Sequence, residues 1–238
     1  MTIDTVIFDW GGTLTPWYTI DHRLAWRSYL GRLAEVDGAV GADPDVLIGR
    51  LTAAEDAAWR RSRDEQQSCT LERILRAAGV AVHEPALEAY YAAWEPHTYT
   101  DPDVPPLFRG LRERDIRIGV LSNTLWSRAS HERWFGRDGV LDLIDGAVYS
   151  CEIPWTKPHP EAFRAALAAV GVADPARAVY VGDRLYDDVH GAVSMGMRAI
   201  HVPHSDIPEH ERGSVQGTPD AVVRRLVDVL AVVDRWRF

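Results

Sequence analysis

Lysine is nearly missing from this chain of 238 residues. Its 26 basic residues include a single lysine, Lys157, and all the others are arginines. Cysteine is almost as scarce, since Cys69 and Cys151 are the only two and lie far apart in the sequence. Two distant cysteines are typical of free thiols in a reducing compartment rather than of a disulfide framework. We therefore expect a cytoplasmic protein.

Long hydrophobic runs are also lacking. No apolar stretch approaches the roughly 20 residues that a membrane-spanning helix needs. The first ten residues, MTIDTVIFDW, contain neither the basic start nor the extended apolar segment of a secretion signal. The net charge of −9 gives no basic excess for binding nucleic acid. We therefore expect neither membranes nor nucleic acids as partners.

Apolar residues are plentiful, at 46% of the chain, and they occur in short runs. Five of these runs have the form of buried parallel strands, and helical patterns lie between and after the later ones. The expected strands span residues 5–9, 116–123, 146–150, 178–183 and 198–202, and the expected helices span 127–135, 160–172, 187–197 and 218–236. This alternation predicts an α/β fold, a Rossmann-like three-layer sandwich around a central parallel sheet.

The interval between the first two expected strands breaks this alternation. It contains no convincing strand, and its apolar residues recur at helical spacing in four segments, 21–36, 44–67, 71–80 and 85–95. A proline-rich stretch, residues 95–106, follows and is interpreted as a linker. The sequence thus predicts a core domain of residues 1–15 and 104–238 with a helical domain of residues 16–103 inserted into it.

Residues suited to binding or catalysis lie at or just after the ends of four of the expected strands. Ligands of open α/β sheets bind beyond the carboxyl ends of the strands, so these residues are expected to converge. The first strand ends in Asp9, followed by Gly11, Gly12 and Thr13, and the second ends in Ser122 and Asn123. Lys157 follows the third strand, and the fourth ends in Asp183, followed by Asp187 and Asp188.

This set of side chains suits phosphoryl transfer. A carboxylate such as Asp9 can attack phosphorus and form an aspartyl-phosphate. Asp9 and Asp183 would repel each other unless a cation lay between them, and oxygen ligands suit Mg²⁺. A hydroxyl, an amide and the Lys157 ammonium can neutralise the oxygens of a phosphoryl group.

Four short motifs carry a resemblance to a known family. In order along the chain they are VIFDWGGTLT, VLSNT, KPHPEAF and YVGDRLYDDVHGAVSMGM. In this order and spacing they resemble the haloacid dehalogenase (HAD) superfamily, in the branch with a helical cap domain inserted just after the first strand. The resemblance covers essentially the whole chain, and the fourth motif is the most specific.

The resemblance implies a role for each motif residue. Asp9 would be the nucleophile, and Ser122, Asn123 and Lys157 would complete the catalytic set. The phosphate would be bound by Gly12, Thr13, Ser122, Asn123 and Lys157. Mg²⁺ would be bound by Asp9, the carbonyl of Gly11, Asp183 and Asp188, with Asp187 as a neighbour rather than a ligand. Three tryptophans, Trp10, Trp17 and Trp155, flank this expected site and could line it.

Gly11 departs from the family pattern. Phosphatases of the family usually have a second aspartate there, which protonates the leaving oxygen and later activates water. General acid–base help of this kind contributes about 10²–10⁴-fold to rate. Without it, the acid could come from the cap, where Asp21 and His22 are candidates, or from a bound water in the vacated space.

Three functions remain open on this evidence. The first is an Mg²⁺-dependent phosphatase acting on a small phosphorylated metabolite, as a monomer or homodimer. The second is a phosphate-ligand binding or regulatory protein with little turnover, because Gly11 replaces the acid. The third and most distant is a haloacid dehalogenase, which needs neither the acid nor a metal. A phosphonatase would need a lysine in the cap, and a phosphomutase would need the missing aspartate.

Overall fold

One parallel sheet lies at the centre of the molecule. The computed structural model describes residues 2–17, 19–38, 43–203 and 214–237. Within these residues six strands form the sheet in the order β3-β2-β1-β4-β5-β6. They are β1 (Thr5–Phe8), β2 (Arg117–Ser122), β3 (Gly146–Tyr149), β4 (Ala178–Gly182), β5 (Arg198–His201) and β6 (Ala221–Val222). The first five are the strands that the sequence predicts, and the expected α/β fold is confirmed.

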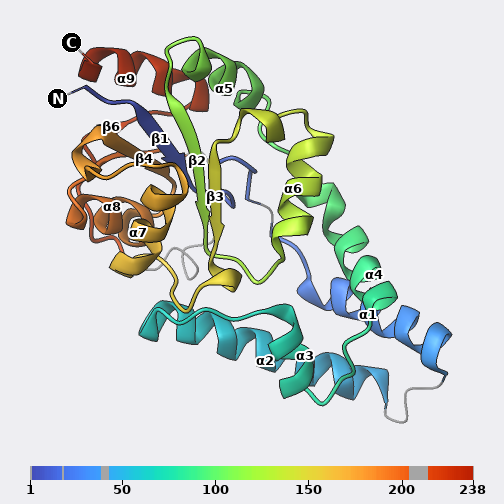
Figure 1. The fold of residues 1–238 in the computed structure, drawn as a ribbon. Coiled ribbons are helices and arrows are strands. Elements are labelled where there is room, and N and C mark those ends of the chain that lie inside the picture. The colour runs from blue at the N-terminus through green and yellow to red at the C-terminus, as the bar shows by residue number, and fades with distance from the viewer. Residues whose placement is uncertain (1, 18, 39–42, 204–213, 238) are drawn as a thin grey trace.

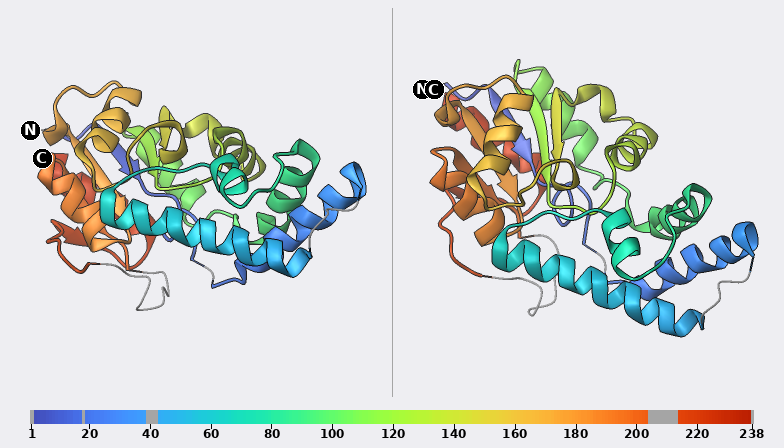
Figure 2. Two further views of the ribbon diagram at one scale, coloured as in Figure 1. Left: turned by 90° about the horizontal axis from the view of Figure 1, so that it is seen from below. Right: turned by 60° about the horizontal axis from the view of Figure 1, so that its bottom comes forward.

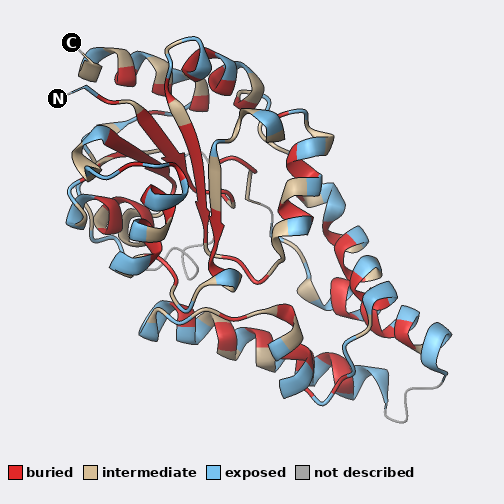
Figure 3. Cartoon of the chain, viewed as in Figure 1, coloured by how far each residue is buried: buried red, intermediate tan, exposed pale blue. Residues whose placement is uncertain are grey.

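Helices cover both faces of this sheet, which is why the central residues of its inner strands are apolar and buried (Figures 1 and 3). Successive side chains of β1 point to opposite faces, so Val6 and Phe8 join one core while Ile7 joins the other. The first core is covered by α5 (Val104–Arg112), α6 (Arg128–Arg137) and α9 (Val229–Arg237). The second is covered by α7 (Pro160–Ala169) and α8 (Gly191–Ser194). The sheet and its two helical layers make a three-layer sandwich.

The end of the chain differs from the sequence prediction. A single helix over residues 218–236 was expected, but β6 occupies residues 221–222 and α9 begins only at Val229. The backbone N–H of Asp220 donates to the Ala199 carbonyl at 2.9 Å, and that of Val223 donates to His201 at 3.0 Å. Hydrogen bonding with the open edge of β5 therefore overrides the helical pattern in this stretch.

The proline-rich stretch 95–106 is also only partly a linker. Helix α5 begins at Val104, so Pro105 and Pro106 lie in its first turn. Proline is tolerated there because the first backbone N–H groups of a helix have no partner within the helix. The buried face of α5 includes Phe108, whose ring lies 5.4 Å from that of Phe8. The return from the inserted helices thus leads directly into the core.

Among the described residues of the interval 16–103, four α-helices occupy the four segments that have helical spacing of apolar residues in the sequence. They are α1 (His22–Asp37), α2 (Pro44–Glu65), α3 (Leu71–Ala77) and α4 (Glu84–Trp94). Helix α1 packs against α4, with the Trp26 and Tyr90 rings 4.6 Å apart, and the Trp26 indole donates to the buried Glu55 of α2 at 2.7 Å. No helix in the described ranges is both long and apolar enough to cross a membrane. The insert lies beyond the carboxyl ends of the strands, with α2 running along the underside (Figures 1 and 2).

Candidate active site

The turn after β1 brings Asp9 into a buried position. Its backbone N–H donates to the Val181 carbonyl at 2.9 Å, which extends the pairing of β1 with β4, and the residue is only 5% exposed. The chain then turns sharply at Gly12, which has a φ of +87°. A Cβ atom on Gly12 would lie 2.4 Å from Asp183 Oδ2. Glycine therefore lets this turn approach Asp183 as closely as it does.

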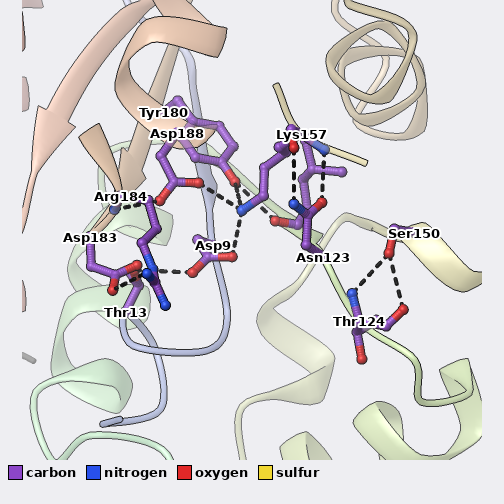
Figure 4. A network of polar contacts seen from close by, with 11 residues as sticks. Asp9, Thr13, Asn123, Thr124, Ser150, Lys157, Tyr180, Asp183, Arg184 and Asp188 are labelled. Carbon is purple, nitrogen blue, oxygen red and sulfur yellow. Dashed lines mark hydrogen bonds and ion pairs between the residues drawn. The ribbon is translucent and has the colours of Figure 1, made fainter. Parts of the chain in front are cut away.

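Lys157 is the central cation of the site (Figure 4). Its ammonium donates to Asp9 Oδ1 at 2.6 Å, to Asp188 Oδ1 at 2.7 Å and to the Tyr180 hydroxyl at 2.9 Å. The residue is 3% exposed. Burial favours the neutral amine, but the charges of Asp188 and Asp9 raise the pKa of Lys157 well above its usual value. The only lysine of the chain is thus held as a buried ammonium ion.

The carboxylates outnumber this one ammonium group. Burial raises the pKa of Asp9 to about 6, against the lowering effect of Lys157 and with a further rise from Asp188. Burial, followed by the charges of Asp9 and Asp188, raises the pKa of Asp183 well above its usual value. Asp183 Oδ2 is buried and makes no hydrogen bond. The site therefore carries more negative charge than Lys157 can balance.

A divalent cation fits this excess of charge. Asp9, Asp183 and Asp188 each offer an oxygen, and these oxygens lie within 4.8 Å of one another. Oxygen ligands of this kind are those that Mg²⁺ prefers, and Asp183 Oδ2, which has an ion pair with Arg184 at 3.7 Å but no hydrogen bond, is the sort of atom that a metal ion satisfies. The three carboxylates that could hold a metal therefore include all the side chains that the resemblance assigns to it.

Asp188, rather than Asp187, is turned towards Lys157. A π-helix over Leu185–His190 follows β4, and such helices are common at functional sites. Asp188 Oδ2 accepts from the Arg184 backbone N–H at 2.9 Å, while a Cβ on Gly182 would lie 2.3 Å from its carboxyl carbon. Gly182 thus makes room for Asp188 as Gly12 does for Asp183.

The remaining motif residues also gather here. Ser122 is 1% exposed at the end of β2, and the Thr13 hydroxyl lies 3.4 Å from both Asp9 Oδ2 and Asp183 Oδ1. The Asn123 amide hydrogen-bonds both backbone groups of Lys157, at 2.8 Å to the N–H and 3.1 Å to the carbonyl. Asn123 therefore positions Lys157, and the contacts of Ser122 and Asn123 with phosphate stay predictions.

The flanking tryptophans have different surroundings. Trp10 is 6% exposed and stacks on Trp134 at 5.6 Å, so its ring belongs to the core rather than to the lining of the site. Trp17 lies under the Arg184 guanidinium at 5.3 Å, next to the acidic residues. Trp155 stacks on His159 at 4.0 Å. Of the three, Trp17 is the one that contacts a neighbour of the candidate ligands.

Neither acid that the sequence suggested for the cap is placed beside Asp9. Asp21 caps α1 by accepting from the Arg23 backbone N–H at 2.9 Å. His22 lies 3.3 Å from Glu55, and the rings of Trp94 and Trp126 separate it from Trp10.

Two residues of the site were missed in the sequence. Tyr180 donates its hydroxyl to the Leu121 carbonyl at 2.9 Å and accepts from Lys157. Arg184 lies 3.7 Å from Asp183 through its Nε. The only signal for Tyr180 is a polar hydroxyl within the otherwise aliphatic run AVYVG of β4. The role of Tyr180 follows from its hydrogen-bond partners in the folded structure, and its place in the sequence does not reveal it.

The sequence also matches known proteins. The model of the haloacid dehalogenase-like hydrolase family matches residues 3–196, and the chain belongs to this family. It is 33% identical to the phosphatase MT3486 of Mycobacterium tuberculosis, over 98% of both chains. It is 31% identical to the glyceraldehyde 3-phosphate phosphatase of Methanopyrus kandleri, over 68% of this chain and 64% of that relative. The matches with three further proteins of the latter name cover less than half of each of them.

Solved structures of similar fold include both phosphatases and dehalogenases. An HAD phosphatase from Thermococcus onnurineus has a TM-score of 0.70 at 21% identity, covering 99% of this chain and 100% of that one. A 2-haloacid dehalogenase from Pseudomonas syringae has a TM-score of 0.64 at 23% identity, with the same coverage. At these identities the likeness concerns the fold alone. The expected membership of the superfamily is confirmed.

Gly12 gives a test of the turn that shapes this site. We expect Gly12→Ala to lower the free energy of unfolding by at least about 1–2 kcal/mol, the cost of a left-handed backbone for a residue with a Cβ. The close contact with Asp183 adds to this cost. Gly11→Ala is the matched control, because no heavy atom lies within 4 Å of its Cβ position. Urea unfolding of both variants measures the difference, and equal stabilities would contradict this account of the turn.

Proposed function

We propose that this chain is an Mg²⁺-dependent phosphatase that hydrolyses a small phosphorylated metabolite through an aspartyl-phosphate on Asp9. The observation that carries the proposal is the position of the Asp9 carboxylate. It is bonded to the only lysine and lies within reach of two further carboxylates suited to a divalent cation. The phosphatase names of its relatives support the same reaction, including phosphoglycolate and phosphoserine phosphatases as well as those above.

The chain's residues prepare the substrate and the nucleophile in the first step. Lys157 keeps Asp9 ionised and oriented, and its positive charge attracts the phosphoryl oxygens. Mg²⁺ held by Asp9, Asp183 and Asp188 would offset negative charge on the phosphoryl group and the carboxylates. A carboxylate oxygen of Asp9 forms a bond to phosphorus while the bond from phosphorus to the leaving oxygen breaks. The leaving oxygen takes its proton from water.

The second step returns the enzyme to its starting state. A water molecule attacks the phosphorus of the aspartyl-phosphate, and the bond between phosphorus and the Asp9 oxygen breaks. The attacking water gives up one proton to solvent, where it neutralises the hydroxide formed in the first step. Inorganic phosphate is released, and Asp9 is again a carboxylate beside Lys157. Ser122, at the carboxyl end of β2, and Thr13, in the turn after β1, would donate hydroxyl hydrogen bonds to the phosphoryl oxygens.

Gly11 restricts the substrates that this chemistry can handle. Without an acid at this position, the leaving group must depart with little help from a proton donor. Aryl and acyl phosphates have leaving groups that carry negative charge more readily than an alkoxide does. We therefore expect them to be turned over faster than alkyl phosphates. The helical insert of residues 16–103 would serve as a cap that excludes water and selects the leaving group.

A second candidate function rests on the same residue. A chain that keeps the pocket but lacks the acid could bind a phosphorylated ligand with little turnover. Gly11 favours this candidate, whereas the intact set of Asp9, Lys157, Asp183 and Asp188 favours the phosphatase. A haloacid dehalogenase is a more distant candidate, because the acidic cluster that suits a metal has no use in metal-free chemistry.

Asp9→Asn tests the nucleophile. We expect it to abolish release of phosphate from aryl, acyl and alkyl phosphates in the presence of Mg²⁺, because the amide is a poor nucleophile. The circular dichroism spectrum should be unchanged. Asp45→Asn is the control, since Asp45 is an exposed residue of α2. Activity retained in Asp9→Asn would refute the assignment, and no release by the wild type from any of these esters would put the binding function first.

Asp183→Asn tests the metal site without using activity. Mg²⁺ should raise the melting temperature of the wild type, because a ligand at about 100 times its Kd stabilises the folded state by about 2.7 kcal/mol. This rise should be lost in Asp183→Asn. The metal-free variant should melt no lower than the wild type, since the substitution removes a buried negative charge that has too few partners. An equal Mg²⁺ effect on both proteins would exclude Asp183 as a ligand.

Gly11→Asp tests whether only the acid is missing. The space around Gly11 is open, so an aspartate side chain can be accommodated. We expect kcat for alkyl phosphates to rise by up to about 10²-fold, the lower end of the contribution of acid–base catalysis. Gly11→Asn is the control, because it has the same shape but donates no carboxyl proton. Similar kinetics for the two variants would show that the missing acid does not limit turnover.

A further inference from the structure

The helical insert is hydrogen-bonded to the core at the turn between α2 and α3, in addition to its two covalent connections. The turn between α2 and α3 pairs with the core segment before Lys157, where Gln67 and Trp155 form an antiparallel bridge. The Ser68 N–H donates to the Pro154 carbonyl at 3.0 Å, and the Thr156 N–H donates to the Gln66 carbonyl at 2.9 Å. Figure 1 shows the end of α2 beside this segment of the core, which follows β3.

Thr156 also completes the end of α2. The last carbonyl groups of a helix lack partners within the helix. Here the N–H groups of Gln66 and Gln67 both go to the Arg61 carbonyl, and the Ser62 carbonyl accepts instead from the Thr156 hydroxyl at 3.2 Å. Thr156 is 2% exposed. A core residue therefore caps a helix of the insert.

The next residue in the chain is Lys157. Its backbone is fixed by the Asn123 amide, and its ammonium must reach three partners at distances of 2.6–2.9 Å. The same turn of the insert is bonded to the loop after β2, where the Leu71 N–H donates to the Leu125 carbonyl at 3.3 Å. The insert thus contacts the chain on both sides of the Lys157–Asn123 pair.

We propose that Thr156 is a positioning residue through which the insert sets the place of the Lys157 ammonium. A shift of the end of α2 pulls on the hydroxyl and N–H of Thr156, and the adjoining peptide carries the shift to Lys157. Misplacement of a reacting group by about 1 Å can cost 10²-fold in rate. Binding of a leaving group by the insert would therefore act on Lys157 without touching it. This inference rests on the proposed phosphatase function.

The insert also contacts the core through α4, at a surface that does not adjoin Lys157 in the chain. There the Trp94 ring of α4 packs on Trp126 at 4.9 Å, and Arg133 of α6 pairs with Glu88 at 3.1 Å. Trp94, Glu88 and Arg133 lie on helices and Trp126 lies in the loop before α6, and none of the four adjoins Lys157 in the chain. The proposed coupling is therefore a property of the α2 end of the insert.

Thr156→Val removes the hydroxyl of Thr156 but keeps the shape of its side chain, so it tests the hydrogen bond alone. Thr156→Ser keeps the donor, and Thr52→Val is the matched control because the Thr52 hydroxyl bonds the Ile48 carbonyl within α2, away from Lys157. Lys157 is the only lysine, so reductive methylation followed by peptide mass spectrometry follows its amine alone, with the N-terminal amine as internal reference. Kinetics with an aryl phosphate provide a second measurement.

We expect Lys157 in Thr156→Val to be methylated about fivefold faster than in the wild type, the change in open population that follows from one lost hydrogen bond. Its kcat should fall by about 10-fold or more with a smaller change in KM, because the loss concerns the placement of a reacting group. Thr156→Ser and Thr52→Val should behave as the wild type in both measurements. If Thr156→Val does not fold, Ser68→Ala serves instead, since it removes the Ser68 hydroxyl bond to the Ile153 carbonyl.

The proposal would be overturned if Lys157 in Thr156→Val were methylated at the wild-type rate. It would also be overturned if Thr156→Val and Thr52→Val changed the methylation rate equally. The labelling result does not depend on catalysis. A wild type without phosphatase activity whose Lys157 is nevertheless exposed by Thr156→Val would therefore refute the proposed function and leave the positioning of Lys157 supported. An active wild type in which Thr156→Val changes neither the methylation rate nor kcat would support the proposed function and refute the positioning role of Thr156.

Discussion

The contact of the Lys157 ammonium with Asp9 and Asp188 is the interaction on which the rest of the site depends. All three groups are buried, and a buried charge is tolerated only where paired charges and hydrogen bonds replace its water. β1, the turn before α7 and the π-helix after β4 must therefore deliver their side chains to one point. The central position of β1 between β2 and β4 makes this possible, because three neighbouring strand ends meet there.

The same constraint explains why glycine occurs where the acidic residues lie closest to the backbone. Gly12 and Gly182 are the two positions at which a Cβ would collide with Asp183 or Asp188. Burial, followed by the charges of the crowded carboxylates, raises the pKa of Asp183, and its Oδ2 has no hydrogen bond. A site built only for stability would avoid both effects. They are reasonable in a protein that binds a cation at this point, since the cation offsets the repulsion.

The sequence was sufficient for those parts of the fold that depend on local pattern. β1 to β5 are apolar runs flanked by turns, and Asp9 and Asp183 directly follow such runs, so both were predictable. The helix expected over residues 218–236 forms only from Val229 onward, because its first residues pair with the free edge of β5, which no local pattern reveals. Tyr180 and Thr156 were missed for a similar reason. Their roles are defined by a lysine and a helix end that are distant in the sequence, and only the folded chain brings them together.

The missing acid at position 11 bears on the role proposed for the insert. A phosphatase with an acid at position 11 can protonate many leaving groups, and it then discriminates between substrates mainly by shape. Gly11 removes that help, although the space around it would admit a side chain. In the proposed reaction the barrier would then depend on the leaving group itself and on how well Lys157 and Asp9 are placed. A connection that lets the insert position Lys157 is most useful in such a site, because accurate placement is the contribution to catalysis that remains.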